Sequence, residues 1–204
     1  MNKTIKNALI LCAITLIAGL LLGGVYEITK DAREEQLKKT QNEAYQSVFK
    51  DAASFEAFEY DKDEISIKLG ENGITEKNVK VDGVVSALDE NKSCIGYVIN
   101  VTAKEGFAGD ISFSVGIDSK NNVTGISILS IGETAGLGMN AKDEVFLSQY
   151  LAERNGLFVV NKEDNTEGTN IDAISGATIT TNAVTKGVNT AILVAESILS
   201  EVKD

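Results

Sequence analysis

The spacing of hydrophobic and polar positions changes along the chain, and its first feature is an uninterrupted apolar run. Residues 8–26 read ALILCAITLIAGLLLGGVY, which is 19 positions without a charge. A helix needs about 20 apolar residues to cross the hydrocarbon core of a bilayer. The run therefore predicts a single transmembrane helix over residues 8–26.

The charges on either side of this run predict its orientation. Lys3 and Lys6 precede it, whereas a mainly acidic stretch that includes Glu27 and Asp31 follows it. Positively charged residues stay on the cytoplasmic side of a membrane. We therefore expect residues 1–7 in the cytoplasm and the chain after Tyr26 outside the cell (inner) membrane.

Two other interpretations of the run are open. A cleaved signal peptide would have an apolar region of about 7–15 residues followed by an A-x-A-like site, whereas this run is longer and continues into GGVYEITK. A lipoprotein would use Cys12, but Leu11 precedes it where a small residue is expected. We interpret the run as an uncleaved anchor.

The segment after the anchor has the period of a helix. Residues 31–58 place apolar side chains on one face, at Tyr45, Val48, Phe49, Ala52 and Phe55, as expected of an amphipathic helix. We therefore expect residues 27–60 to form a helical connector between the anchor and an extracytoplasmic domain over residues 61–204.

The middle of the chain alternates apolar and polar positions, which is typical of strands with one buried face. The alternation covers residues 65–69, 95–101, 111–115 and 123–130, and the turn-rich SKNN between the last two predicts an antiparallel hairpin. A short apolar strand is expected over residues 157–160. Helical periodicity returns at residues 141–151 and again from Thr178 to Val202, with a buried face of Val184, Val188, Ala191, Ala195 and Ile198.

Strands in the middle with helices on either side predict the fold class. We expect an α+β domain, an antiparallel β-sheet with flanking helices, preceded by one N-terminal transmembrane helix.

Composition excludes several kinds of function. The net charge of −11 argues against nucleic acid as a partner, since nucleic acid selects basic surfaces. The chain has no His, which excludes His-based triads and His-ligated zinc or haem. Its two cysteines, Cys12 and Cys94, are far apart, so neither a disulfide scaffold nor a cysteine-ligated iron–sulfur cluster is expected, and no metal site is predicted.

A glycine-rich loop is the first candidate for a site. Residues 132–144 read GETAGLGMNAKDE, between a predicted strand and a predicted helix. Glycine allows a close approach of the backbone to a ligand, which makes Glu133, Thr134, Gly136, Leu137 and Gly138 a possible cofactor-facing loop. An ordinary glycine-rich connection is the alternative. No GK[ST] follows, so the loop is not a phosphate-binding P-loop.

The second candidate is the stretch IDAISGATITTNAVTKGV over residues 171–188, where small residues and hydroxyls precede a helix. Ser175 or Thr178 could simply cap that helix, with Asp172 favoured by the helix dipole. A helix start is also a natural anion site, because its first N–H groups have no helical partner. Gly176 and Ala177 would leave the backbone uncovered beside the Thr178 hydroxyl.

These residues resemble a known motif. DAISGAT is similar to the flavinylation motif D-x-x-S/T-G-A-T/S of the FMN-binding domain family, and GETAGLG resembles that family's ETPGLG loop, with Ala135 where Pro is usual. With one N-terminal span before an extracytoplasmic domain, the plan resembles the G subunits of Rnf electron-transport complexes. It is similar also to the C subunits of sodium-pumping NADH:quinone reductases.

The resemblance implies the cofactor, the site and the partners. FMN would be joined by a phosphodiester to Thr178, which closes the motif formed with Asp172, Ser175, Gly176 and Ala177. A separate flavin transferase would take FMN from FAD with Mg²⁺ and recognise residues 172–178. The chain would then be a redox subunit that does not turn over substrate alone. Its partners would be the membrane and the other membrane subunits of a complex that couples ferredoxin/NAD-type electron transfer to ion translocation.

Two other classes of function remain as alternatives. A pilin-like structural protein also has an apolar N-terminal helix before a β-rich domain. Such a protein would have a processing site at the start of the apolar run and an acidic residue soon after it, and this sequence has neither. A non-enzymatic extracytoplasmic binding module could use the two glycine loops without a covalent cofactor.

The anchor interpretation predicts that the mature protein keeps its N-terminus at Met1 or Asn2. We expect protease added outside the membrane to digest the C-terminal domain and leave the anchor protected. Intact mass and N-terminal sequencing of the membrane-extracted protein test this. A mature N-terminus near Glu27 would contradict it.

Overall fold

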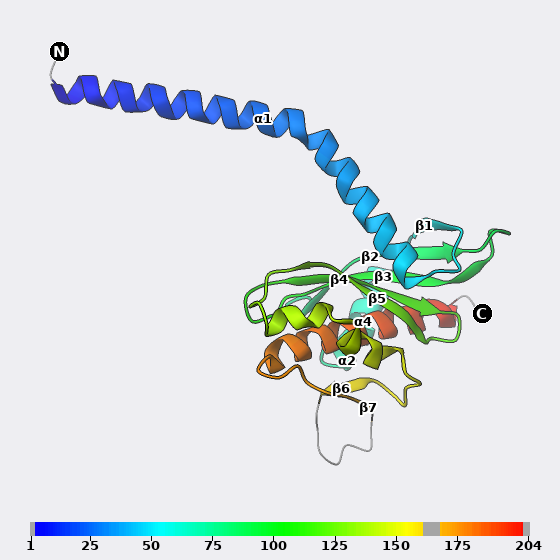
Figure 1. Cartoon of the computed structure of the whole chain (residues 1–204). Helices are drawn as coiled ribbons and strands as arrows, with labels where there is room; N and C mark the ends of the chain where they lie inside the picture. Colours follow the sequence, from blue (N-terminus) through cyan, green and yellow to red (C-terminus); the bar gives the residue numbers. More distant parts are fainter. Residues whose placement is uncertain (1–2, 161–167, 202–204) are drawn as a thin grey trace. The chain divides into compact units, whose positions relative to one another are not determined.

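The computed structural model describes residues 3–160 and 168–201, and it divides into two compact units, Met1–Asn42 and Glu43–Asp204 (Figure 1). Helix α1 (Lys3–Val48) makes up the first unit and ends in the second. The most apolar stretch of this helix, 18 residues long, has a mean hydropathy of 2.6, and none of its residues is buried. By length and composition α1 is able to cross a membrane, and the predicted span of residues 8–26 lies within it.

The second unit is built on a five-stranded sheet. Its strands follow the order of the chain, and each is antiparallel to its neighbours. They are β1 (Ser54–Phe58), β2 (Val79–Leu88), β3 (Cys94–Ala103), β4 (Ile111–Asp118) and β5 (Val123–Ile131). The α+β fold with an antiparallel sheet is therefore confirmed, as is the predicted β4–β5 hairpin.

Helices and a second small sheet complete this unit. The remaining elements are α2 (Lys62–Glu71), the 3₁₀ helix η1 (Gly138–Lys142), α3 (Glu144–Leu147), the 3₁₀ helix η2 (Ser148–Leu151), β6 (Phe158–Val160), β7 (Thr169–Ile171) and α4 (Thr178–Glu201). Strands β6 and β7 are parallel to each other. The predicted C-terminal helix is confirmed within the described residues; Val202, its last predicted residue, lies outside them.

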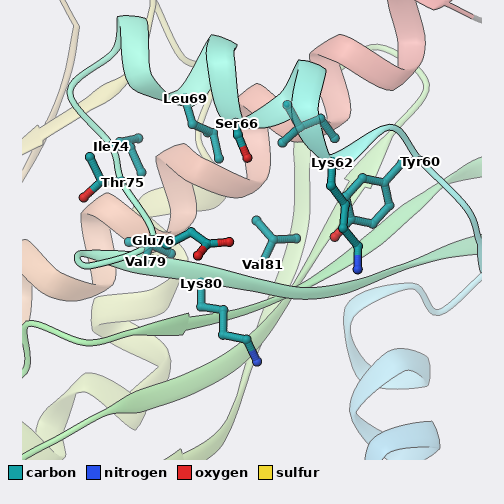
Figure 2. Close-up of a pocket in the computed structure, with 11 residues that line it drawn as sticks. Tyr60, Lys62, Ser66, Leu69, Ile74, Thr75, Glu76, Val79, Lys80 and Val81 are labelled. Carbon is teal, nitrogen blue, oxygen red and sulfur yellow. The ribbon is translucent and has the colours of Figure 1, made fainter.

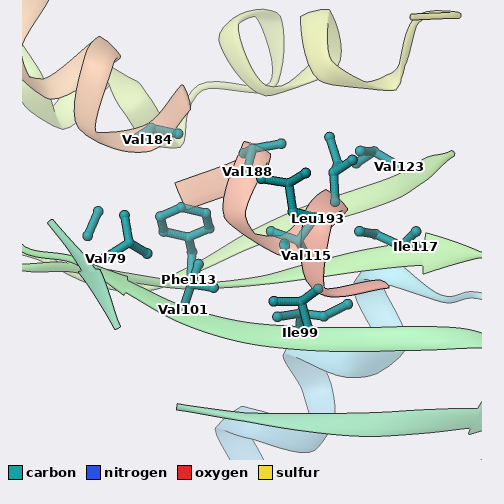
Figure 3. Close-up of a cluster of buried hydrophobic side chains, with 14 of the residues drawn as sticks. Val79, Ile99, Val101, Phe113, Val115, Ile117, Val123, Val184, Val188 and Leu193 are labelled. Atoms are coloured by element: carbon teal, nitrogen blue, oxygen red, sulfur yellow. The ribbon is translucent and has the colours of Figure 1, made fainter. Parts of the chain in front are cut away.

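Helices lie against both faces of the sheet. Helices α2 and α4 cover one face, and the end of α1 from residue 43 covers the other (Figure 1). On the α4 side, Ile99, Phe113 and Val115 of the sheet face Val184 and Val188 (Figure 3). On the opposite side, the smaller cluster consists of Tyr45, Val48, Phe49, Ala52, Ala87 and Val98.

A glycine allows α4 to approach the sheet closely. Gly187 lies over the Phe113 ring, and a Cβ built on it would overlap that ring. Phe113 is fully buried, so the ring has little room to move aside. The contact fixes the height of α4 above β4 and hence the place where the helix begins.

The end of α1 is held to the sheet by polar contacts as well as apolar ones. The buried Asn100 side chain donates to the Tyr45 hydroxyl at 2.7 Å and accepts from Ser114 Oγ at 2.7 Å. Thr124 Oγ1 donates to the Val48 carbonyl at 2.6 Å. These bonds satisfy a carbonyl at the helix end and the polar atoms beneath it, as buried polar groups require.

Two sequence predictions in this region are wrong. The helix predicted over residues 31–58 ends at Val48, and residues 54–58 are strand β1. The predicted connector over residues 27–60 is thus helical only in its first part. The strand predicted at residues 65–69 is helix α2, because Asp61 caps it by accepting from the N–H groups of Asp63 and Glu64.

The same apolar residues fit both periods, which explains the second error. Ile65 and Leu69 are buried at helical spacing, whereas Ile67 is 66% exposed.

The helix predicted over residues 141–151 is a series of three short turns, η1, α3 and η2. Strand β6 is confirmed one residue shorter than predicted, and β2 and β7 were not predicted.

Replacing Gly187 by Ala should destabilise the protein, although Gly→Ala in a helix is usually favourable by about 1 kcal/mol. The added methyl must displace the Phe113 ring, and overpacking of this kind costs about 1–3 kcal/mol. Gly70→Ala in α2 is the matched control, because no atom lies within 4 Å of its added Cβ. Chemical denaturation should show a loss for Gly187→Ala and none for Gly70→Ala; equal stability of the two variants would refute the close contact.

Candidate functional site

The two loops that the sequence singles out meet at one pocket. It has a volume of about 350 Å³ and is open to solvent. Three segments line it, one of which the sequence did not suggest; the lining residues are Phe107, Glu133, Thr134, Leu137, Gly138, Gly176, Ala177, Thr178, Ile179 and Thr180. Its size lies within the range of small-molecule sites, about 300–1,000 Å³.

A tight turn presents the start of α4 to this pocket. The Ala177 N–H donates to the Ile174 carbonyl at 2.9 Å, which closes a four-residue turn. Its third residue, Gly176, has φ +72°, the left-handed value that a type II turn needs at that position. The buried Thr181 hydroxyl reinforces the turn: it accepts from the Ile174 N–H at 3.1 Å and donates to the Ala177 carbonyl at 3.0 Å.

Thr178 is the first residue of α4, and its side chain is exposed at the pocket. Its hydroxyl makes no hydrogen bond with any residue that the structure describes. At the helix start, the Thr181 N–H donates to the Ala177 carbonyl, so the N–H groups of residues 178–180 come before the first helical bond. An accessible hydroxyl therefore stands at a place that favours negative charge.

Two buried polar side chains also face the pocket. Glu133 is 7% exposed and Thr180 is 1% exposed. A Cβ built on Gly138 would lie 2.7 Å from Glu133 Oε2 and 2.8 Å from Thr180 Oγ1, so both groups crowd the same glycine. Within the described chain, Glu133 Oε1 accepts from the Ala108 N–H at 3.3 Å, while neither Oε2 nor Thr180 Oγ1 has a hydrogen-bond partner. Since neither atom is fully buried, both are accessible from the pocket and can pair with a polar group of a ligand.

Apolar side chains surround the opening. Phe107, Leu137 and Ile179 are 68%, 42% and 53% exposed. Apolar side chains gathered around a cavity and left open to solvent are typical of a surface that a planar organic ligand or a partner covers.

Phe107 is a lining residue that sequence reasoning missed. It lies in the β3–β4 loop, which is tied down on both sides: the Ala108 N–H binds Glu133, and Glu105 forms an ion pair with Lys186 of α4. Asn78 Nδ2 also donates to Glu105 at 2.6 Å. The Lys186 hydrogen bond is the main cause that lowers the pKa of Glu105 below its ordinary value. An aromatic between two glycines, as in EGFAG, was the available signal.

Some predicted site residues do not line the pocket. Gly136 has φ +74° and open space around its Cβ position, so it shapes the loop without lining the cavity. Ser175 lies in the tight turn, exposed to solvent. Asp172 is exposed at a neighbouring hollow formed with residues of η1, α3 and η2.

Another hollow lies between α2 and β2, where Ser66 and Leu69 face Val81 (Figure 2). It is smaller, about 180 Å³. Burial and, to a lesser degree, the nearby Asp82 carboxylate raise the pKa of Tyr60 on its edge. None of the residues that line this hollow belongs to the two loops that the sequence analysis singled out. The candidate site residues lie instead at the pocket beside the start of α4.

Two family models match the chain. The FMN-binding domain matches residues 106–193, which include all the residues that line the pocket, and the RnfG N-terminal region matches residues 1–48. The chain is 33% identical over 198 residues to the G subunit of the Na(+)-translocating ferredoxin:NAD(+) oxidoreductase complex of Acetobacterium woodii, covering 95% of this chain and 92% of that one.

Other proteins are similar over a comparable length. The G subunit of the proton-translocating ferredoxin:NAD(+) oxidoreductase complex of Clostridium ljungdahlii is 32% identical over 92% of this chain and 87% of its own. Among solved structures, the crystal structure of Shewanella oneidensis NqrC is 18% identical, with a TM-score of 0.48, over 76% of this chain and 73% of that one.

Thr181→Val should destabilise the start of α4, because it keeps the shape of the side chain but removes both hydroxyl bonds. Leaving the Ile174 N–H without its partner at this part-buried position should cost about 1 kcal/mol or more. Thr181→Ser keeps the hydroxyl and loses one buried methyl, about 0.8 kcal/mol. Denaturant midpoints should therefore rank the parent first, Ser second and Val last, and a Val variant as stable as the parent would contradict this role.

Proposed function

The chain belongs to the family of G subunits of Rnf-type ion-translocating ferredoxin:NAD(+) oxidoreductase complexes, and from that premise we propose that it is a membrane-anchored electron carrier with FMN joined covalently to Thr178. The family resemblance is confirmed by the relatives and by the FMN-binding domain match. The proposal of a covalent link rests on the exposed Thr178 hydroxyl, which is unpaired among the described residues and stands at the mouth of a pocket with buried polar groups.

The residues of the pocket fit FMN by their chemistry. The N–H groups at the start of α4 suit a phosphate, because the helix dipole and the free donors both favour an anion. Glu133 and Thr180 offer a carboxylate and a hydroxyl to the polar groups of a flavin. Phe107, Leu137 and Ile179 offer apolar surface to its ring system.

Attachment requires the Thr178 hydroxyl to act as a nucleophile. With FAD as donor, Thr178 Oγ1 forms a bond to the phosphorus of the FMN half, the bond between the two phosphates breaks, AMP leaves, and the hydroxyl proton is released to a base. A threonine hydroxyl is a poor nucleophile at neutral pH, and no titratable group among the described residues hydrogen-bonds it. A separate Mg²⁺-dependent flavin transferase that recognises residues 172–178 supplies that base.

Once attached, FMN supplies one-electron and two-electron chemistry, and the protein holds, orients and tunes it. In this chain the helix start would offset the charge of the phosphodiester, and the Glu133 carboxylate would make one side of the flavin's surroundings polar. The tether keeps the cofactor on a domain that lies outside the cytoplasm, where a dissociating cofactor would be lost. Other subunits of the complex would exchange electrons with the tethered flavin.

Helix α1 anchors this domain as a single-pass segment with its N-terminus in the cytoplasm. Lys3 and Lys6 before the apolar run support that orientation, as the positive-inside rule requires. Residues 61–204 then form the FMN-binding domain outside the cytoplasm, next to the membrane subunits that accept or donate the electron.

Thr178→Val should abolish covalent flavin, because it removes the oxygen through which the phosphodiester forms. Thr178→Ser should keep it, and Thr180→Val and Thr181→Val should still carry flavin at the end of the reaction. Intact mass, together with a yellow chromophore that stays with acid-precipitated protein, gives the result. Because the Thr178 side chain is exposed, we expect its change to Val to alter stability by no more than about 0.5 kcal/mol.

The controls separate this proposal from its alternatives. Flavin mapped to Thr180 or Thr181 would show that the attachment site is wrong. A flavin that acid precipitation releases would favour a noncovalent binding module, and a parent protein without flavin would favour a structural role.

A further inference from the structure

Gln149, which lies outside the flavinylation motif, clamps the backbone of Asp172 at the start of that motif. The Asp172 N–H donates to Gln149 Oε1 at 2.7 Å, and Gln149 Nε2 donates to the Asp172 carbonyl at 3.4 Å. One side-chain amide therefore pairs with both polar groups of a residue that is 23 positions away, in the manner of a neighbouring strand.

The element that carries Gln149 is itself firmly placed. Gln149 lies in η2, next to Tyr150, which is fully buried. The Tyr150 hydroxyl is 2.7 Å from Thr185 Oγ1 of α4, and its ring makes edge contacts with Phe146 and Phe158. Gln149 therefore reaches the motif from a support that is anchored to the same helix that begins with Thr178.

The motif is held at its other end as well. Thr181 fixes Ile174 and Ala177 through its buried hydroxyl. The backbone of residues 172–178 is thus fixed at both ends, while the Asp172 side chain and the Thr178 hydroxyl are left exposed. The Asp172 carboxylate makes no hydrogen bond with the described residues, so it is available to a partner.

We propose that Gln149 is a positioning residue for flavin attachment, which presents the Asp172–Thr178 segment to the flavin transferase in a fixed conformation. The inference rests on the proposed function of Thr178. A segment that is already ordered loses less conformational entropy when an enzyme binds it. Loosening its first residue should therefore weaken recognition by the transferase without touching the nucleophile.

The opposite mechanism makes the opposite prediction. If the transferase must pull the segment out into an extended form, the two bonds to Gln149 oppose that step. Removing them would then accelerate the attachment.

The experiment uses the full-length chain without flavin, in detergent, with purified transferase, FAD and Mg²⁺. Gln149→Leu keeps the volume of the side chain and removes both bonds, whereas Gln149→Glu keeps an acceptor for the Asp172 N–H. Ser148→Ala is the matched control, because it removes a hydrogen bond to Val145 within the same short turns without touching the motif.

We expect Gln149→Leu to lower kcat/KM for flavin attachment about two- to tenfold, mainly through KM. This is the range for one hydrogen bond, because the second bond is 3.4 Å long and therefore weak. The final extent of attachment should equal that of the parent. Amide hydrogen exchange of the flavin-free chain gives an independent readout: exchange at Asp172 should speed up in Gln149→Leu and stay near the parent value in Gln149→Glu and Ser148→Ala.

Several outcomes would overturn the inference. They are an unchanged or faster attachment rate in Gln149→Leu, unchanged exchange at Asp172, and an equal slowing in Ser148→Ala. A parent chain that takes up no FMN at Thr178 contradicts the proposed function itself and removes the basis of this inference; the mass of the parent reveals that failure before any variant is compared.

Discussion

The packing of α4 against the sheet is the contact on which the rest of this domain depends. The Phe113 ring fills the space that a side chain at Gly187 would occupy, and the buried face of the helix continues from Val184 to Ile198. Close packing leaves little freedom to slide or rotate such a helix. The first turn of α4 is therefore placed by the core, and the exposed hydroxyl at its start is placed with it.

That placement explains why the proposed cofactor site lies at a helix start. Free N–H groups and a partial positive charge occur at every helix start. What distinguishes this one is its surroundings: the left-handed Gly176 turns the chain sharply, Gly138 lets a second loop come close, and Glu133 and Thr180 add polar groups. A general property of helices thus becomes a specific pocket because three segments meet at it.

The sheet also separates two tasks. Its face toward α4 supports the pocket, whereas its other face receives the end of α1 through Tyr45, Val48 and Phe49. The chain of hydrogen bonds from Tyr45 through Asn100 to Ser114 joins the end of α1 to the strands that carry the α4 side of the core. The cofactor domain is in this way bonded to the last turns of the helix that precedes it.

Local patterns in the sequence determined much of this protein. The apolar run of residues 8–26, the alternating strands and the long apolar stripe of α4 each repeat with the geometric period of one element, so period and composition suffice to find them. The Asp172–Thr178 segment and the loop from Glu133 to Gly138 were also noticed from local composition. Glycine allows a close approach of the backbone to a ligand, and hydroxyls cap helix starts.

Only the tertiary structure decided how these pieces combine. Ile65, Ile67 and Leu69 fit a strand or a helix until the Asp61 cap and the burial of Ile65 and Leu69 favour the helix. Residues 54–58 pair with β2, and strand pairing depends on a partner far along the chain. Phe107 joins the pocket, Gly136 does not line it, and Gln149 reaches Asp172 across 23 positions. Such contacts between distant residues leave no local period in the sequence, since their geometry is set by the packed core.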